Sequence, residues 1–89
     1  MSSFYTNEEL IELGLKSFGD NVLISKKCSI YGAKNIEIGN NVRIDDFCIL
    51  SGRIIIKNNV HIAAGVYIFA GSDGVFFNDF SGISSRSVI

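Results

Sequence analysis

Few side chains in this sequence of 89 residues can carry catalytic chemistry. His61 is the single histidine, and an imidazole with an ordinary pKa of about 6.5 can accept and return a proton near neutral pH. Cys28 and Cys48 are the two thiols. The sequence contains no G-x-x-x-x-G-K-S/T phosphate loop, no Cys-x-x-Cys pair and no Gly-x-Ser-x-Gly nucleophile motif. Phosphate binding by such a loop, thiol redox work and serine hydrolysis therefore have no support in the sequence.

A recurring five-residue phrase predicts the elements that position these side chains. Its copies begin 20, 18 and 20 residues apart and occupy residues 18–22, 38–42, 56–60 and, in weaker form, 76–80. A period of this size indicates a solenoid, in which each repeat forms one coil stacked on the previous one.

From residue 18 onward the chain divides into six-residue units with a regular apolar pattern. Each unit begins with an apolar residue that is expected to point inward: Phe18, Ile24, Ile30, Ile38, Ile44, Leu50, Ile56, Ile62, Ile68 and Phe76. A second inward position lies two residues before most of the later starts: Val22, Cys28, Ile36, Val42, Cys48, Ile54, Val60 and Val66. This alternation is typical of strands with one buried face, and three units make about one triangular turn of 18 residues.

Two features predict the corners of the coils. One corner carries an asparagine or aspartate in every repeat, at Asn21, Asn41, Asn59 and Asp79. These residue types tolerate the left-handed backbone that a tight bend requires. The two longer coils are explained by a two-residue insertion at another corner, within residues 31–35 and near residues 71–74. Insertions at one corner of a repeat mark one face of the solenoid, often the functional one.

The N-terminal segment is predicted to form a short helix that caps the first coil. Thr6 is a favourable N-cap, Glu9 completes a capping box, and Gly14 is a natural C-terminal stop. The apolar residues expected to cover the open end of the coil are Phe4, Leu10, Ile11, Leu13 and Leu15. A frayed terminal helix is the alternative. We expect one domain, with the capping helix and its lead-in over residues 1–17 and the repeat region over residues 18–89.

Composition and charge limit the partners and the compartment. The chain is 47% hydrophobic, and its net charge of −1 arises from scattered charges, which argues against nucleic acid or an anionic membrane as the main partner. The acidic N-terminus lacks the pattern of a secretory signal, and the longest nearly apolar stretch, residues 62–70, is too short to span a bilayer. We therefore expect a cytoplasmic protein, with Cys28 and Cys48 as small buried hydrophobes at equivalent positions of consecutive coils.

The six-residue units at 38–43, 44–49 and 56–61 resemble those of the hexapeptide-repeat acyltransferases. The resemblance covers residues 18 to about 80 and is closest to bacterial sugar O-acetyltransferases of the galactoside, maltose and lipopolysaccharide type. It implies an all-β solenoid, a left-handed parallel β-helix of about 3.5 coils with a short N-terminal capping helix. The left-handedness comes from the resemblance alone, because parallel crossovers are otherwise almost always right-handed.

The resemblance also implies a mechanism. Members of the family form trimers that bind acetyl-CoA in the cleft between subunits, and a histidine takes a proton from a sugar hydroxyl or amine as that group attacks the thioester. We accordingly expect acetyl transfer from acetyl-CoA, as co-substrate, to a sugar hydroxyl, in a homotrimer and without a metal. The alternative is a truncated, non-catalytic β-helix module that serves oligomerisation. A zinc hydratase on the same fold would need three histidine ligands, and the sequence has one.

His61 is the candidate for the catalytic base that the resemblance implies. It lies between inward Val60 and Ile62, so its side chain is expected to point outward, in a column with Arg43 and Ser81. An outward histidine could face an intersubunit cleft, but the same position is also a common filler of a strand face. The catalytic histidine of the family usually occurs in a loop or a later coil.

Other outward residues are candidates for binding. The carboxylates expected to contact a sugar acceptor are Asp45, Asp46 and Asp73, and no residues are assigned to the coenzyme. The outward apolar residues expected to form a subunit interface are Ile49, Tyr67, Phe69 and Phe77. Because the chain stops partway through the fourth coil, we expect either the front part of a longer acyltransferase or a shortened relative that buries its end in an oligomer.

Overall fold

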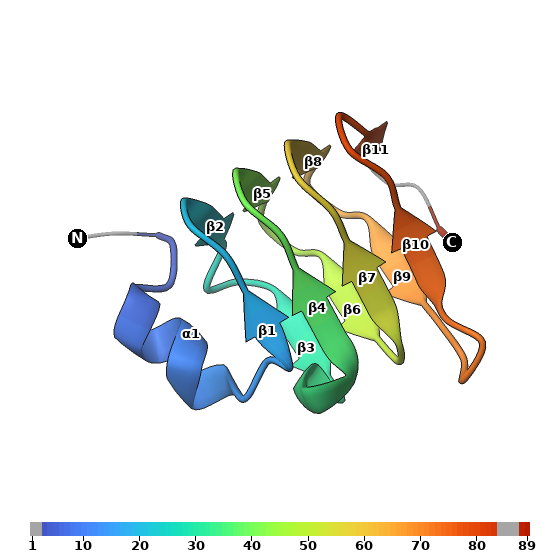
Figure 1. Cartoon of the computed structure of the whole chain (residues 1–89), viewed down its shortest axis with the longest axis horizontal. Coiled ribbons are helices and arrows are strands. Elements are labelled where there is room, and N and C mark those ends of the chain that lie inside the picture. Colours follow the sequence, from blue (N-terminus) through green and yellow to red (C-terminus); the bar gives the residue numbers. More distant parts are fainter. Residues whose placement is uncertain (1–2, 84–87) are drawn as a thin grey trace.

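The computed structural model describes residues 3–83 and 88–89, which form a stack of coils with one helix at its N-terminal end (Figure 1). The helix, α1, spans Asn7–Leu13, and a 3₁₀ turn, η1, spans Ala33–Asn35. The strands among the described residues are β1 (Ser17–Phe18), β2 (Val22–Ile24), β3 (Ser29–Tyr31), β4 (Ile36–Ile38), β5 (Val42–Ile44), β6 (Ile49–Ser51), β7 (Ile54–Ile56), β8 (Val60–Ile62), β9 (Tyr67–Phe69), β10 (Val75–Phe77) and β11 (Gly82–Ile83).

The strands form three parallel sheets, one for each side of the solenoid. The first sheet has the order β1-β4-β7-β10, the second β11-β8-β5-β2 and the third β3-β6-β9. Each strand pairs with the equivalent strand of the next coil, and Val22, Val42 and Val60 are in register along the second sheet. The predicted solenoid of parallel strands with an N-terminal helix is therefore confirmed.

The interior of the solenoid is filled mainly by the inward side chains that the alternation predicts, and Leu10, Ala70 and Phe77 are buried in addition. The buried apolar residues are Leu10, Val22, Ile24, Cys28, Ile36, Ile38, Val42, Ile44, Cys48, Leu50, Ile54, Ile56, Val60, Ile62, Val66, Ile68, Ala70 and Phe77. In β5 and β8 the two outer residues are buried and the middle one is exposed, because successive strand side chains point to opposite faces. Full burial stabilises each aliphatic side chain by about 1.5–3 kcal/mol relative to exposure.

Both cysteines are part of this core, as predicted. Cys28 and Cys48 are buried free thiols, and their Sγ atoms donate hydrogen bonds to the backbone oxygens of Asp45 and Ala63 at 3.0 and 3.1 Å. The hydrogen bond with Cys48, together with burial, raises the pKa of the Cys28 thiol. Cys28 therefore stays protonated and acts as a packing group.

The helix begins at the predicted cap. Thr6 Oγ1 accepts a hydrogen bond from the backbone N of Glu9 at 3.2 Å, and Glu9 Oε1 accepts one from the backbone N of Thr6 at 2.9 Å. Gly14 ends the helix in the left-handed conformation. Leu10 is fully buried, but Ile11 is 68% exposed, so the prediction that Ile11 covers the coil is wrong. Consecutive helical residues point about 100° apart, and only one of this pair can face the core.

The corner between the first and second sheets repeats one hydrogen-bonded turn. Left-handed backbone occurs there, as predicted, at Asn21, Asn41 and Asn59, with φ of 56°, 57° and 59°. The side chains of Asn40 and Asn58 each accept a hydrogen bond at 2.7 Å from a backbone N of the preceding coil. These bonds tie successive coils together where the β ladders are interrupted.

The fourth coil differs from the prediction by one residue. Phe77, and not Phe76, aligns with inward Ile56. Phe77 is 6% exposed and Phe76 is 53% exposed, so the predicted inward Phe76 and outward Phe77 are reversed. The same shift gives Phe80, instead of Asp79, the left-handed corner with a φ of 61°.

The length of one loop explains this shift. The segment from Ile30 to Ile36 is two residues longer than the equivalent segment from Leu50 to Ile54, as predicted. The equivalent segment of the next coil, from Ile68 to Val75, is three residues longer than Leu50 to Ile54 instead of two. Because strand side chains alternate, one additional residue moves every following side chain to the opposite face until the register is restored.

Candidate functional site

His61 lies at the middle of β8, with its side chain on the outer face of the second sheet. It is in register with Arg43 on one side, as predicted, and with Gly82 on the other, where Ser81 was predicted. The imidazole is 57% exposed, and its Nε2 lies 2.8 Å from Oδ2 of Asp45. The structure therefore pairs the candidate base with a candidate substrate-binding carboxylate.

Asp45 follows β5 at the corner between the second and third sheets and has a partner on each oxygen. Arg43 Nε donates to Oδ1 at 2.8 Å, while His61 Nε2 contacts Oδ2. Burial alone would raise the pKa of Asp45, but the hydrogen bonds from Arg43 and His61 and the charges of these groups outweigh burial and lower the pKa below its ordinary value of 3.8. Asp45 is thus ionised at neutral pH and can only accept, so Nε2 of His61 is the donor in this contact, and in the neutral form of the imidazole the lone pair is on Nδ1.

Asp46 is held by the scaffold beside this pair. Oδ1 of Asp46 accepts a short hydrogen bond from Oγ of Ser25, which is fully buried. The Ser25 hydroxyl oxygen in turn accepts a bond from the backbone N of Lys27 at 3.1 Å. A hollow of about 320 Å³ has both carboxylates in its wall; its lining residues are Ser3, Phe4, Arg43, Asp45, Asp46 and Ala64.

Asp73 is not part of this arrangement. It is exposed in the loop between β9 and β10, at the corner between the third and first sheets, whereas His61 lies on the second sheet. The structure thus brings Asp45 to His61, directs the Asp46 carboxylate to Ser25, and places the third predicted carboxylate at a different corner.

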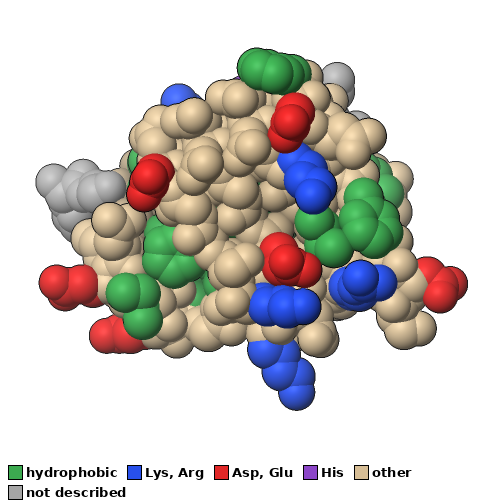
Figure 2. Space-filling model, in the orientation of Figure 1, with side chains coloured by type: hydrophobic (Ala, Val, Ile, Leu, Met, Phe, Trp, Pro, Cys, Tyr) green, Lys and Arg blue, Asp and Glu red, His purple; other side chains and the backbone are tan. Residues whose placement is uncertain are grey.

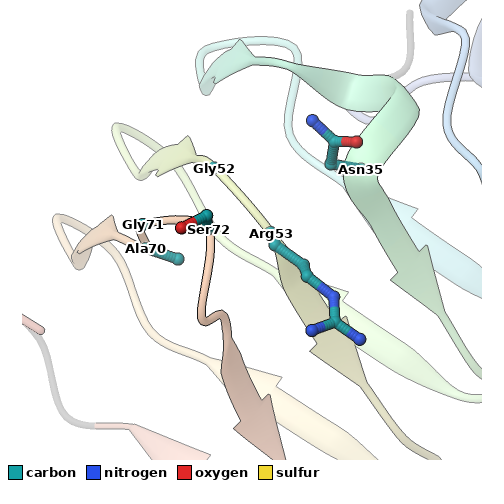
Figure 3. A pocket seen from close by; sticks show the side chains of 6 residues that line it. All are labelled: Asn35, Gly52, Arg53, Ala70, Gly71 and Ser72. Atoms are coloured by element: carbon teal, nitrogen blue, oxygen red, sulfur yellow. The ribbon is translucent and has the colours of Figure 1, made fainter.

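A second hollow lies at the corner that carries the insertions (Figure 3). We call it the corner notch; it has a volume of about 420 Å³ and is lined by Asn35, Gly52, Arg53, Ala70, Gly71 and Ser72. The notch forms because the coils before and after carry longer loops, while the middle coil turns at Gly52 and Arg53 alone. Sequence analysis missed Arg53, although the short corner between two insertions was a signal that could have identified it.

Exposed apolar side chains lie mainly around the third sheet. Ile49 and Tyr67 are in register, as predicted, and the Tyr67 and Phe69 rings meet edge to face with centroids 6.3 Å apart. Phe77 is buried, so the prediction that it belongs to the interface is wrong. On the face shown in Figure 2, charges of both signs are interspersed with separate apolar side chains.

Among the described residues, no three His, Cys, Asp or Glu side chains are grouped closely enough to hold a metal ion. No helix in the described ranges is long and apolar enough to cross a bilayer. The expectation of metal-free chemistry stays a prediction.

Replacing Asp45 with asparagine is expected to destabilise the protein by about 0.5–1 kcal/mol at neutral pH, because the ion pair with Arg43 is lost and the hydrogen bond with His61 is weakened. The pKa of Asp45 is lower in the folded than in the unfolded chain, so its contribution is complete above the ordinary value of 3.8 and is lost as the pH falls through the folded value. Urea unfolding of the wild-type protein and of Asp45→Asn between about pH 7 and pH 3 should therefore show a difference in the free energy of unfolding that decreases in acid.

Asp73→Asn is the matched control, because Asp73 is exposed and forms no ion pair within residues 3–83 and 88–89. This variant should stay within about 0.5 kcal/mol of the wild-type protein. A difference for Asp45→Asn that persists unchanged into acid would contradict the stabilising role of the ionised carboxylate.

Comparisons with known proteins agree with this fold and repeat. Residues 35–70 match the family model described as bacterial transferase hexapeptide (six repeats). A curated relative from Escherichia coli, dTDP-4-amino-4,6-dideoxy-D-glucose acyltransferase, is 52% identical over 81 residues, which are 88% of this chain and 42% of the relative. The predicted resemblance to hexapeptide-repeat acyltransferases is confirmed.

Solved structures of AntD, an N-acyltransferase from Bacillus cereus, are similar over nearly the whole chain. The complex of AntD with dTDP and 3-hydroxybutyryl-CoA has a TM-score of 0.96 at 56% identity, covering 99% of this chain and 47% of AntD. A serine-to-cysteine variant of AntD in complex with dTDP-4-amino-4,6-dideoxyglucose and coenzyme A has a TM-score of 0.95 at 55% identity, with the same coverage.

These relatives refine the expectations from sequence. The chain spans less than half the length of the relatives that it matches. The Escherichia coli relative is described as an acyltransferase of a dTDP-linked amino sugar, and the AntD variant structure contains such a sugar together with coenzyme A. A hydroxyl acceptor, an acetyl donor, a homotrimer and a cytoplasmic location stay predictions.

Proposed function

We propose that the protein acts in the transfer of an acyl group from coenzyme A to the amine of a dTDP-linked 4-amino-4,6-dideoxy sugar. The observation that carries this proposal is the match to AntD, with a TM-score of 0.96 over 99% of this chain. At 56% identity the likeness extends beyond the fold to the side chains. An amine acceptor replaces the hydroxyl expected from sequence, because the AntD relative is described as an N-acyltransferase.

In the proposed reaction, the nitrogen lone pair attacks the thioester carbonyl, a C–N bond forms, and the C–S bond breaks to release the coenzyme as a thiolate. The nitrogen must lose a proton in this step. Nδ1 of His61 is the acceptor that the structure offers, because Nε2 is occupied by Asp45 and the imidazole is 57% exposed. The proton then passes to the leaving thiolate, which restores the neutral imidazole.

Asp45 acts in this proposal as a positioning residue. Its carboxylate fixes the tautomer and orientation of the imidazole, and Arg43 in turn holds the carboxylate. The exposed position of His61 fits a site that is completed by a neighbouring subunit or by further coils, and a homotrimer remains our proposal for the assembly.

A direct assay tests the proposed function. The protein is mixed with dTDP-4-amino-4,6-dideoxyglucose and either acetyl-CoA or 3-hydroxybutyryl-CoA, and free coenzyme thiol and product mass are measured. We expect thiol release together with a nucleotide sugar that carries one acyl group. A matched nucleotide sugar with a hydroxyl in place of the amine should not react. Reaction of the hydroxyl compound alone would favour O-transfer, and no reaction with either would favour the non-catalytic oligomerisation module.

A further inference from the structure

The corner notch has a cation whose charge is not neutralised by a neighbour. Within the described residues, Arg43 pairs with Asp45 and Lys16 and Lys26 pair with glutamates, but Arg53 forms no ion pair. The notch lies at the corner between the third and first sheets, whereas His61 lies on the second sheet. The charge of Arg53 is therefore available to a ligand, and it lies at a different place on the solenoid from the Asp45–His61 pair.

Two contacts hold the Arg53 side chain in place. Its guanidinium carbon lies 5.5 Å from the centroid of the Phe76 ring, a distance typical of a cation–π contact. Its Cγ and Cδ lie so near Gly74 that a Cβ added there would approach them to 3.3 Å. These contacts restrict the side chain, and such a restriction reduces the entropy that binding must overcome.

The other walls of the notch add neutral polar groups. Figure 3 shows Asn35 on the preceding coil and Ser72 on the following coil, with Arg53 on the coil between them and its guanidinium directed away from both. An amide and a hydroxyl can each donate a hydrogen bond, and the planar guanidinium matches the geometry of phosphate oxygens. Asp73 follows Ser72 in the sequence, and its negative charge opposes an anionic ligand. The attraction of the ligand to Arg53 must therefore exceed its repulsion by Asp73.

We propose that the corner notch binds the phosphate groups of a nucleotide-linked substrate, with Arg53 as the principal contact. This inference rests on the proposed function, in which both substrates carry a diphosphate: the dTDP-sugar and the acyl-coenzyme A. The shared chemistry is a phosphoryl anion bound by the guanidinium, with the amide of Asn35 and the hydroxyl of Ser72 on the other walls of the notch.

Calorimetric titrations of the protein with dTDP, with coenzyme A and with inorganic pyrophosphate test the proposal. Arg53→Gln removes the charge and the fork of donors, and it should weaken binding of pyrophosphate and of one nucleotide about tenfold or more. Lys57→Gln is the matched control, because it removes the same charge from an exposed residue at a different corner. It should change affinity by less than about twofold at physiological ionic strength.

The three ligands distinguish the sources of the phosphate. Weaker dTDP binding with unchanged coenzyme A binding assigns the notch to the nucleotide sugar, and the reverse assigns it to the coenzyme. If the wild-type protein binds neither nucleotide, the proposed function is contradicted. Binding of pyrophosphate still tests the notch in that case. Equal losses of affinity in Arg53→Gln and Lys57→Gln, or no loss of affinity in either variant, would contradict phosphate binding in the notch.

A second variant covers the case in which Arg53→Gln fails to fold. Gly71→Asp adds a carboxylate to the wall of the notch, and a Cβ at Gly71 meets no atom within 4 Å, so folding should be unaffected. Binding of pyrophosphate and of the same nucleotide should again weaken about tenfold, now by repulsion. Unchanged affinities in Gly71→Asp would contradict the proposal.

Discussion

Replacing His61 with alanine is expected to lower the turnover number about 10²- to 10⁴-fold, the usual contribution of a general base. The imidazole is the only group in the described pair that can accept a proton at neutral pH, because Asp45 is already engaged by Arg43 and by His61 itself. The side chain is 57% exposed, so its removal should leave folding and assembly intact. The measurement is steady-state kinetics with acyl-CoA and the amino sugar, together with molecular mass in solution.

A graded series separates catalysis from structure. Asp45→Asn keeps an acceptor oxygen near Nε2 but removes the negative charge, so its turnover number should lie between those of the wild-type protein and His61→Ala. The KM values for both substrates should change little in either variant, because neither side chain is proposed to bind substrate before the reaction. If turnover by His61→Ala equals that of the wild-type protein, His61 is a filler of the strand face and the base lies elsewhere.

The stack of coils was predictable because inward positions depend on a simple alternation. In β5 and β8 burial of the first and third residues requires apolar side chains there, whereas in β6 and β9 the middle residue is the inward one, so the inward positions recur at the same places in successive coils. The corner asparagines add an independent signal, since Asn21, Asn41 and Asn59 all adopt the left-handed backbone that their residue type favours. Two signals of different physical origin therefore agreed on the same period.

The fourth coil was harder to predict because its sequence is ambiguous. Phe76 and Phe77 are equally apolar neighbours, so alternation cannot decide which of them points inward. The decision depends on the number of residues in the preceding loop, and a surface loop accepts one more residue at little cost in free energy. The structure resolves the ambiguity through pairing of Phe77 with Ile56.

The candidate site was predictable only in part. The outward direction of His61 and its register with Arg43 follow from the repeat. Its pairing with Asp45 does not, because that contact joins a strand to the corner of the preceding coil and depends on side-chain rotamers. The free charge of Arg53 is a similar case, since only the structure shows which cations in the described chain lack an acidic neighbour.

Replacing Gly52 with alanine is expected to destabilise the protein by about 3–5 kcal/mol, which is large for a single methyl group. Gly52 has a φ of 94°, where side chains are disfavoured. An added Cβ would also lie 1.5 Å from the backbone oxygen of Ala70, so the corner would have to open. Opening it would break the 2.7 Å hydrogen bond that the backbone N of Ala70 donates to Ser51. Urea unfolding gives the free energy difference.

Gly71→Ala is the control that isolates this cause. It adds the same methyl group one residue beyond Ala70, where no atom lies within 4 Å and φ is not positive, and should change stability by less than about 0.5 kcal/mol. The contrast matters for function because Gly52 lines the corner notch. A coil that can turn only with glycine keeps the middle corner short, and the longer loops of the coils on either side then flank the exposed Arg53. Equal stabilities of the two alanine variants would show that the corner relaxes freely and does not define the notch.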